Sequence, residues 1–168
     1  MEQIKTILIK HNDVTVELMK QIAELKSIRW NYPVENQLKW MNDNLKNEDY
    51  HLLIYIANQL VAYTNFVDIQ VQINKQPIPF KGIGNVCTAE SGKGWGDLLM
   101  KSINEVITTH NWNGVLLCKD NLVDYYEKYG WILVDKNNIF SKQLQSINTL
   151  TFNLDSKIVF FEYNNVLF

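Results

Sequence analysis

One stretch of the sequence combines residue types that bind phosphate. Ser91-Gly92-Lys93-Gly94-Trp95-Gly96-Asp97 lies between an expected strand that ends near Thr88 and a clearly amphipathic helix. Glycines let the backbone turn tightly and bring bare N–H groups close to a ligand, and the first N–H groups of a helix have no partner within the helix. This combination favours a phosphate ligand, to which Lys93 adds positive charge. The alternative is a plain glycine-rich turn that caps a helix.

The loop differs from the two common nucleotide-binding motifs. A Walker A loop needs four residues between its first glycine and Gly-Lys-Ser/Thr, and residues 91–97 lack that arrangement. Two stretches, from Gly82 and from Gly92, begin like the Rossmann fingerprint Gly-x-Gly-x-x-Gly. Neither completes it, because Cys87 and Asp97 occupy the position of the last glycine. Any phosphate ligand therefore belongs to another class.

Alternating strands and helices are expected to position this loop. Periodicity predicts strands over 4–9, 51–57, 60–73, 79–88, 114–118 and 131–134, and helices over 14–25, 33–45, 98–107 and 123–128. The order predicts a mixed α/β (α+β) fold around one central sheet, as a single domain over residues 1–168.

Some local features are also expected. Asn12 or Asp13 is the predicted N-cap of the first helix, which turns Lys26 outward, and Gly130 is a predicted C-cap. The tail, 150–154 and 157–163, is predicted to form a hairpin that turns at residues 155–156.

A second motif follows the apolar strand at 114–118. Residues 120–131, from Asp120 to Trp131, together with the glycine loop resemble the GNAT superfamily of acyl-CoA-dependent N-acetyltransferases. Their pyrophosphate loop reads (Arg/Gln)-x-x-Gly-x-(Gly/Ala), which residues 91–96 match except at Ser91. Their next segment often reads Asp-Asn-x-x-x-Phe-Tyr-x-Lys-x-Gly-Phe, and residues 120–131 match it with Tyr125 and Trp131 in place of the phenylalanines. The resemblance covers residues 50–135 best.

The resemblance implies a sheet that splays open between its fourth and fifth strands to hold acetyl-CoA. Three isolated histidines and the lack of a Cys-x-x-Cys pair argue against a metal site. Gly82 and Gly84 fit a bulge in the fourth strand, or else leave packing room for a bulky neighbour. Asn121 is placed to bond the pantetheine or the cofactor, or to cap a helix. Backbone groups on the cofactor would come from Val86, Cys87, Thr88, Gly92, Lys93, Gly94, Trp95 and Gly96.

The implied chemistry is direct attack of an amine on the thioester. Tyr126 matches the family's tyrosine that faces the CoA sulfur, and a phenol that titrates near 10 stays protonated at neutral pH and can act as general acid. A base that deprotonates the amine stays open among Glu90, Asp68 and Glu162. Cys87 as an acyl-carrying nucleophile is the lesser interpretation, because no histidine is adjacent in the sequence.

The acceptor is expected to be an amine of a small molecule or a peptide. Arg29, Trp30 and Tyr32 are expected to line its pocket. Ser91 replaces a long side chain that commonly helps to wrap the pyrophosphate, and this departure motivates an alternative. The chain is then a catalytically silent CoA-binding or regulatory module on the same fold. A third hypothesis is a protein-interaction domain without cofactor.

Composition limits the remaining partners. The net charge is −2 and the fifteen lysines are scattered, so nothing favours nucleic acid. No apolar run approaches the roughly 20 residues that span a bilayer, and no signal peptide is evident. Cys87 and Cys118 are expected to be reduced. The lack of a membrane span, the lack of a signal peptide and the reduced cysteines together predict a cytoplasmic protein with no membrane partner. The apolar segment 158–161 allows a homodimer.

Overall fold

The computed structural model describes residues 3–168 as two compact units. The first unit holds the chain up to Val67 and Asn85–Ile103, and the second holds Asp68–Gly84 and Asn104–Phe168. The strands are β1 (Ile4–Lys10), β2 (Tyr50–Ile56), β3 (Gln59–Ile73), β4 (Gln76–Thr88), β5 (Gly114–Cys118), β6 (Ile132–Leu133), β7 (Asn148–Phe152) and β8 (Phe161–Glu162). The α-helices are α1 (Val16–Arg29), α2 (Val34–Asn44), α3 (Trp95–Thr109) and α4 (Val123–Glu127). Strands pair in the order β1-β2-β3-β4-β5-β7-β6, with β8 beside β3. This mixed α/β fold confirms the predicted fold class.

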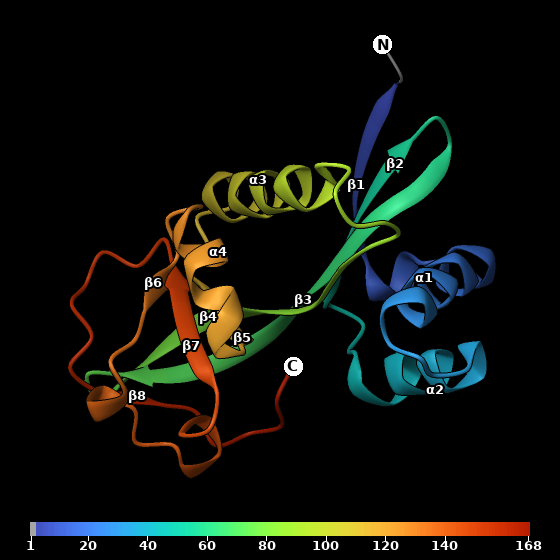
Figure 1. Ribbon diagram of the computed structural model, residues 1–168. Helices are drawn as coiled ribbons and strands as arrows, with labels where there is room; N and C mark the ends of the chain where they lie inside the picture. Colours follow the sequence, from blue (N-terminus) through green and yellow to red (C-terminus); the bar gives the residue numbers. More distant parts are fainter. Residues whose placement is uncertain (1–2) are drawn as a thin grey trace. The chain divides into compact units, whose positions relative to one another are not determined.

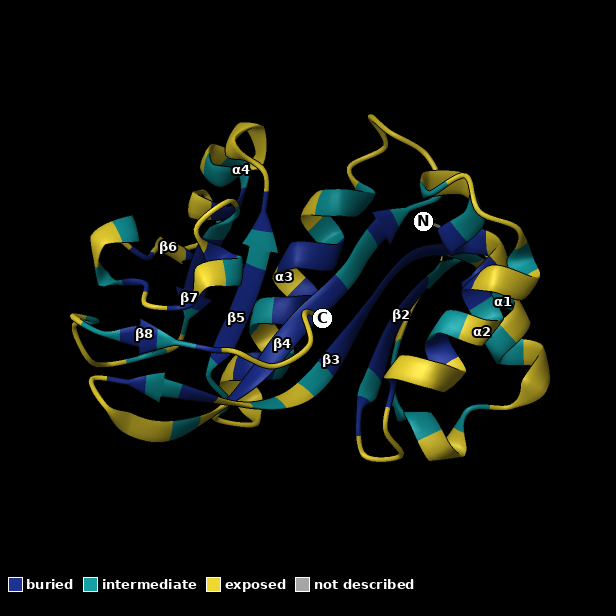
Figure 2. Cartoon of the chain, turned by 90° about the horizontal axis from the view of Figure 1, so that it is seen from below, coloured by how far each residue is buried: buried dark blue, intermediate teal, exposed yellow. Residues whose placement is uncertain are grey.

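In the first unit, two helices pack on an antiparallel sheet. β1 pairs with β2 from Ile4↔Ile56 to Lys10↔Tyr50, and β2 pairs with β3. α1 and α2 lie side by side (Figure 1). Figure 2 shows β2 and β3 buried over most of their length, whereas the outer faces of the helices are exposed. The buried residues that join the helices to the sheet are Ile22, Ala23, Leu25, Met41, Leu45, Leu53, Tyr63 and Cys87.

The caps of these helices differ slightly from the expectation. Thr15 is the N-cap of α1, because its Oγ1 accepts a hydrogen bond from the Leu18 N–H at 3.2 Å. Asn12 and Asp13 instead belong to a 3-10 turn, His11–Asp13. Pro33 is the N-cap of α2 rather than its first helical residue.

In the second unit, the sheet changes from parallel to antiparallel. β4 pairs with β5 in parallel at Lys81↔Gly114 and the two following positions, and β5 and β6 both pair with β7 in antiparallel register. The expected tail hairpin is wrong. β8 pairs with β3 through Ile73↔Phe161 and Gln72↔Glu162, because Phe161 is buried in the core of this unit rather than against β7.

The residue of β4 with a left-handed backbone is Asn85 rather than a glycine. Asn85 has a φ of 54°, in the left-handed region that asparagine tolerates better than most residues. Its Nδ2 donates a hydrogen bond of 2.6 Å to Oδ1 of Asn65, which ties this residue to β3. Gly82 provides packing room instead, since a Cβ there would lie 2.6 Å from Cγ of Phe168.

Gly82→Ala is therefore expected to lower the free energy of unfolding by about 1–3 kcal/mol, because the added methyl group overpacks the Phe168 ring. Urea unfolding of the wild type and the variant measures the loss. In a Phe168→Ala background the same substitution should cost clearly less. An equal loss in both backgrounds would show that the ring is not the obstacle.

Candidate functional site

The glycine loop of the first unit has the backbone geometry that a bound phosphate needs. Gly92 and Gly94 have φ values of 76° and 77°, which L side chains rarely adopt. A Cβ at either position would meet no atom within 4 Å, so open space lies in front of both residues. The first hydrogen bond of α3 runs from the Leu98 N–H to the Gly94 carbonyl at 3.1 Å. The loop thus presents backbone beside the positive end of a helix of 15 residues.

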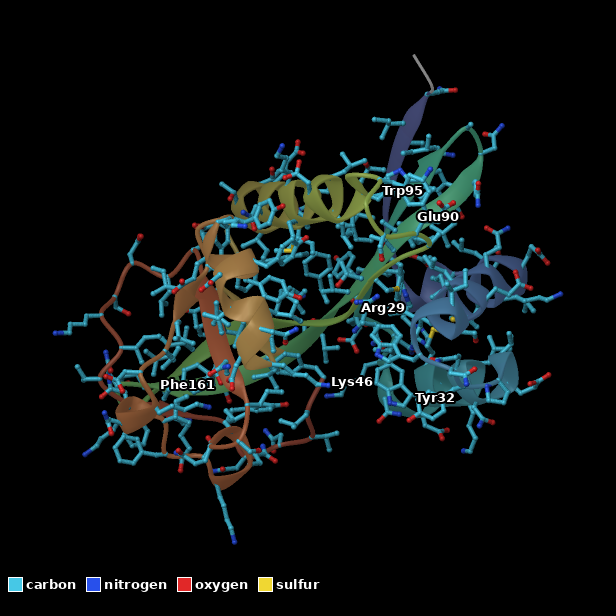
Figure 3. The ribbon with its side chains drawn as sticks, in the orientation of Figure 1. Arg29, Tyr32, Lys46, Glu90, Trp95 and Phe161 are labelled. Atoms are coloured by element: carbon cyan, nitrogen blue, oxygen red, sulfur yellow. The ribbon has the colours of Figure 1, made fainter. Side chains whose placement is uncertain are left out.

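Contacts at its entrance anchor the loop to the sheet. The Ala89 N–H donates to the Val61 carbonyl at 2.8 Å, and the Thr88 hydroxyl donates to the Glu90 carbonyl at 3.1 Å. Lys93 forms an ion pair of 3.6 Å with Glu90, and both side chains are more than half exposed. Exposed pairs of this kind are weak, so Lys93 is free to exchange Glu90 for a phosphate. Glu90 and Trp95 lie at this loop (Figure 3).

The end of β4 leads from Asn85 to the loop. Val86 and Thr88 are half-buried, and Cys87 is buried among the residues under α1 and α2. Burial raises the pKa of the Cys87 thiol to about 12, although Lys26 and Arg29 both act to lower it. At neutral pH only about one thiol in 10⁵ is then ionised. The geometry favours a packing role for this side chain over a nucleophilic one.

Tyr126 and Asn121 belong to the second unit. Tyr126 lies on α4, is 7% exposed, and has its pKa raised to about 12 by burial first and by Cys118 and Tyr125 second. The Tyr125 ring contacts it edge-on with centroids 5.2 Å apart. Asn121 is exposed in the 3-10 turn Asp120–Leu122 and caps neither that turn nor α4, both of which begin without a side-chain cap.

The predicted acceptor wall and the predicted bases also divide between the units. Arg29 is the last residue of α1, and Trp30 and Tyr32 lie between α1 and α2 in the first unit. Arg29 and Tyr32 are exposed (Figure 3), and Trp30 is half-buried. Asp68 and Glu162 belong to the second unit, where Asp68 forms an ion pair with the buried Lys81.

The sequence analysis missed a buried polar cluster beneath α1. His51 is fully buried and hydrogen-bonds through Nδ1 to the Tyr63 hydroxyl at 2.8 Å and through Nε2 to Nδ1 of His11 at 2.9 Å. Burial, together with His11 and Lys26, lowers the pKa of His51 to about 3, so this imidazole is neutral. His51 lies in an apolar strand, and the register of β2 with β3 pairs it with Asn65, which leaves Tyr63 diagonally opposite. This neighbourhood is not evident from the local sequence.

The expectation that Lys26 faces solvent is wrong, because this lysine is buried. Lys26 is 1% exposed, and its ammonium lies 4.2 Å from the centre of the Trp40 ring. Burial lowers its pKa from 10.5 to about 8. The last turn of α1 turns this position towards the sheet, and its neighbour Leu25 is buried as well.

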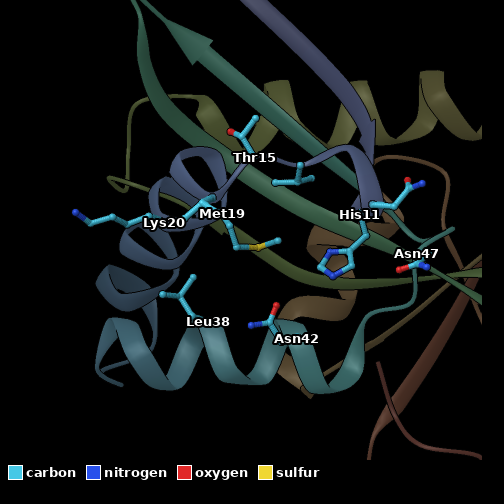
Figure 4. Close-up of a pocket in the computed structure, with 10 residues that line it drawn as sticks. His11, Thr15, Met19, Lys20, Leu38, Asn42 and Asn47 are labelled. Atoms are coloured by element: carbon cyan, nitrogen blue, oxygen red, sulfur yellow. The ribbon is translucent and has the colours of Figure 1, made fainter.

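A cavity of about 500 Å³ opens between the start of α1 and α2 in the first unit. Met19 and Leu38 line its apolar side, and His11, Asn42 and Asn47 line its polar side (Figure 4). None of the site residues predicted from the sequence lines it.

Comparison with known proteins identifies the architecture. No protein-family model and no curated protein matches the sequence. Among solved structures, an acyl-CoA N-acyltransferase from Pseudomonas aeruginosa superposes with a TM-score of 0.64 at 19% identity, over 89% of this chain and 99% of that one. The chain has the GNAT fold. ElaA from Escherichia coli matches with a TM-score of 0.63, 19% identity and the same coverage, and the GNAT-family N-acetyltransferase YhbS from E. coli, solved with CoA, matches with 0.65 at 14% identity over 97% of this chain and 89% of that one.

The GNAT fold predicted from the two motifs is therefore confirmed. Sequence identities this low support the fold and not a shared activity. Within residues 3–168, no helix is long and apolar enough to cross a membrane, and no group of three or more potential metal-ligating side chains gathers.

The buried Lys26 predicts an alkaline rise in stability. Below pH 8 this lysine is protonated in both the folded and the unfolded state, whereas between about pH 8 and 10.5 only the unfolded state keeps the proton. Raising the pH through this window increases the contribution of Lys26 to the free energy of unfolding by up to about 1.4 kcal/mol per pH unit. Above about pH 9 the Cys87 thiol, whose pKa is raised from 9.0 to about 12, acts in the opposite direction, so the net rise is expected between about pH 8 and 9. Lys26→Met should remove that rise in urea unfolding measured from pH 7 to 10. Lys39→Met, at an exposed lysine of α2, should keep it; an unchanged slope in Lys26→Met would contradict the assignment.

Proposed function

We propose that the protein is an acetyl-CoA-dependent N-acetyltransferase of the cytoplasm that acetylates a primary amine of a small molecule or peptide. The single observation that carries the proposal is the open backbone at Gly92 and Gly94, next to the start of α3 on a GNAT fold. Of the structures with this fold, YhbS and an aminoglycoside 6'-N-acetyltransferase were solved with CoA.

The diphosphate of CoA would bind the N–H groups of residues 92–96. Serine at position 91 offers a shorter reach than the Arg or Gln of the motif, and Lys93, released from Glu90, supplies the compensating charge. The pantetheine arm would follow the backbone of Val86–Thr88, with Asn121 as a further amide donor. The Cys87 side chain takes no part, since its thiol stays protonated.

The reaction would proceed by direct attack. A neutral amine nitrogen bonds to the thioester carbonyl carbon, and the oxyanion that forms accepts a hydrogen bond from a backbone N–H at Val86–Thr88. The nitrogen loses its extra proton to a base, which stays open among Glu90, Asp68 and Glu162. The carbonyl then re-forms as the C–S bond breaks, and the Tyr126 hydroxyl donates to the departing sulfur. With its pKa near 12, this phenol is protonated at every physiological pH, but full transfer to a thiolate is uphill, because a thiol is a stronger acid than this phenol. Its contribution is then chiefly a hydrogen bond to the developing negative charge.

A catalytically silent CoA-binding module is the second candidate, which the short Ser91 favours. Mixing the protein with acetyl-CoA and a panel of amines, and following free CoA, separates the two. Release of CoA that depends on an amine supports the enzyme. CoA binding by calorimetry without release on any amine supports the silent module, and absence of binding overturns both.

Gly94→Val is expected to weaken CoA binding by at least about 100-fold, because the branched side chain fills the open space at this left-handed position. Calorimetric titration with CoA measures the change. Asn111→Val is the matched control, since it places valine at a similarly positive φ of 52° in the turn before β5. Equal affinity in Gly94→Val and the wild type would exclude the loop as the diphosphate site.

Tyr126→Phe is expected to lower kcat by about 10- to 100-fold and to leave the Kd for CoA within about twofold. A hydrogen bond to a charged group contributes about 1.5–3 kcal/mol, and the substitution removes only the hydroxyl. Stopped-flow or steady-state CoA release provides kcat. Tyr125→Phe, at the neighbouring ring, is the control, and an unaltered kcat in Tyr126→Phe would remove its role.

A further inference from the structure

The cavity between α1 and α2 contains no residue of the proposed reaction. Its volume of about 500 Å³ lies within the roughly 300–1,000 Å³ of small-molecule sites. Val14, Met19 and Leu38 form its apolar part, and all three are half-buried. Figure 4 shows that Met19 and Leu38 enter this space from opposite helices. The cavity therefore offers an apolar surface to a ligand.

The polar part of the cavity carries hydrogen-bonding groups that the protein leaves unused. Asn12, Asn42 and Asn47 line it, and their carboxamide groups have no hydrogen-bond partner within residues 3–168. Each carboxamide offers an acceptor oxygen and two donor hydrogens. Among the lining residues Lys20 is charged, but it pairs with Glu24 at 3.9 Å and extends away from the others (Figure 4). The unused polar groups are thus mostly neutral.

A chain of hydrogen bonds connects this cavity to the core of the first unit. His11 lines the cavity, and its Nδ1 lies 2.9 Å from Nε2 of His51, whose Nδ1 lies 2.8 Å from the Tyr63 hydroxyl. Tyr63 is 0% exposed, and its hydroxyl has no second partner within residues 3–168. If that hydroxyl only accepted a bond from His51, its own hydrogen would be buried without an acceptor, which is costly. The Tyr63 hydroxyl therefore donates to His51.

This direction fixes the tautomers of both imidazoles. A neutral imidazole has one N–H, so His51, which accepts at Nδ1, donates from Nε2 to Nδ1 of His11. Burial lowers the pKa of His11, although Asp49 acts to raise it, and His11 is therefore neutral at pH 7.5 as well. With Nδ1 as an acceptor, His11 carries its hydrogen on Nε2. That N–H has no partner within residues 3–168 and is left for a ligand.

The charges around His11 favour a neutral ligand. Asp49 is 0% exposed, and its carboxylate, which accepts from the Lys46 N–H at 2.7 Å, acts on His11. A ligand carboxylate at Nε2 of His11 would be repelled by Asp49, and an ammonium or amidinium group has no lone pair to accept the hydrogen. A carboxamide avoids both problems, because its carbonyl accepts from His11 and its NH₂ group can donate to the asparagine oxygens.

We propose that this cavity binds a neutral small molecule that combines a carboxamide with an apolar group. The ligand carbonyl accepts from Nε2–H of His11, its NH₂ group donates to the oxygens of Asn42 and Asn47, and its apolar group packs against Met19 and Leu38. The inference does not rest on the proposed function, since none of these residues takes part in acyl transfer. Either proposal can therefore fail alone.

Three ligands of one shape and different charge test the proposal. At pH 7.5 benzamide is neutral, benzoate is an anion and benzamidine is a cation. Each is titrated into the ¹⁵N-labelled full chain at millimolar concentration, and amide shifts are followed by NMR. Benzamide should shift the amides of the lining residues in a saturable manner, with a Kd at least about tenfold lower than that of either charged analogue. Tighter binding of benzoate or benzamidine would overturn the neutral class, and no saturable shift with benzamide would overturn the site.

Variants assign the binding to the cavity. Asn42→Trp should weaken benzamide binding at least about tenfold, because the indole fills the space that the ligand needs. Asn36→Trp is the matched control, since it changes another exposed asparagine of α2 that does not line the cavity. Met19→Trp fills the same space from α1 and serves as the second variant should Asn42→Trp fail to fold. Wild-type affinity in the folded cavity variants would overturn the location.

The ¹⁵N shifts of the imidazole nitrogens test the role of His11 separately. In the wild type at pH 7.5, Nε2 of His11 should carry the hydrogen and should respond more strongly to benzamide than either nitrogen of His51 does. A hydrogen on Nδ1 of His11, or shifts that do not respond to benzamide, would overturn the assignment of His11 as the donor.

Discussion

The candidate site depends on two left-handed residues ahead of α3. Gly92 and Gly94 turn the chain out of β4 and into the helix with their outer faces open. Any side chain at these positions would both strain the backbone and fill that space. Because the Ala89 N–H bonds to β3 on one side and the helix begins at Gly94 on the other, the turn is held at both ends. A short segment thereby combines free backbone donors with a helix dipole, which is the arrangement that binds phosphate.

A second constraint concerns charge beneath α1. The first unit buries Lys26, His51 and Tyr63 on the face of the sheet that the helices cover. His51 escapes the cost of burial by staying neutral and hydrogen-bonded on both ring nitrogens. Lys26 has no such partner and is compensated only by an aromatic face.

The sequence predicted those features that local chemistry determines. The glycine loop, the amphipathic helix after it and the apolar strand at Gly114–Cys118 all follow from residue type and periodicity. Gly130 has a positive φ of 82°, but it lies two residues beyond Lys128, which is the C-cap of α4. The Asp120–Trp131 motif indicated the GNAT fold, although neither a family model nor a curated protein matches the chain.

Features that depend on tertiary contacts could not be predicted from the sequence. The left-handed residue of β4 is Asn85, whose side-chain amide donates to Asn65 of β3, and this contact across two strands is not evident from the local sequence. β8 joins β3 rather than β7, since Phe161 fills a distant core. Lys26 follows the same rule, because only the packing of α1 on the sheet decides whether a lysine in its last turn is exposed. The role of Tyr126, the base and a homodimer through 158–161 stay predictions.

The central claim is that the open loop binds the diphosphate of CoA. Parallel calorimetric titrations of the wild-type protein and Gly94→Val with CoA and with pantetheine test it most directly. Pantetheine has the same arm and thiol but neither the diphosphate nor the 3'-phosphoadenosine, and the variant assigns the difference to the loop. The account predicts saturable binding of CoA and an affinity for pantetheine at least about 100-fold weaker. Equal affinities for the two ligands, or no binding of CoA at millimolar concentration, would contradict it.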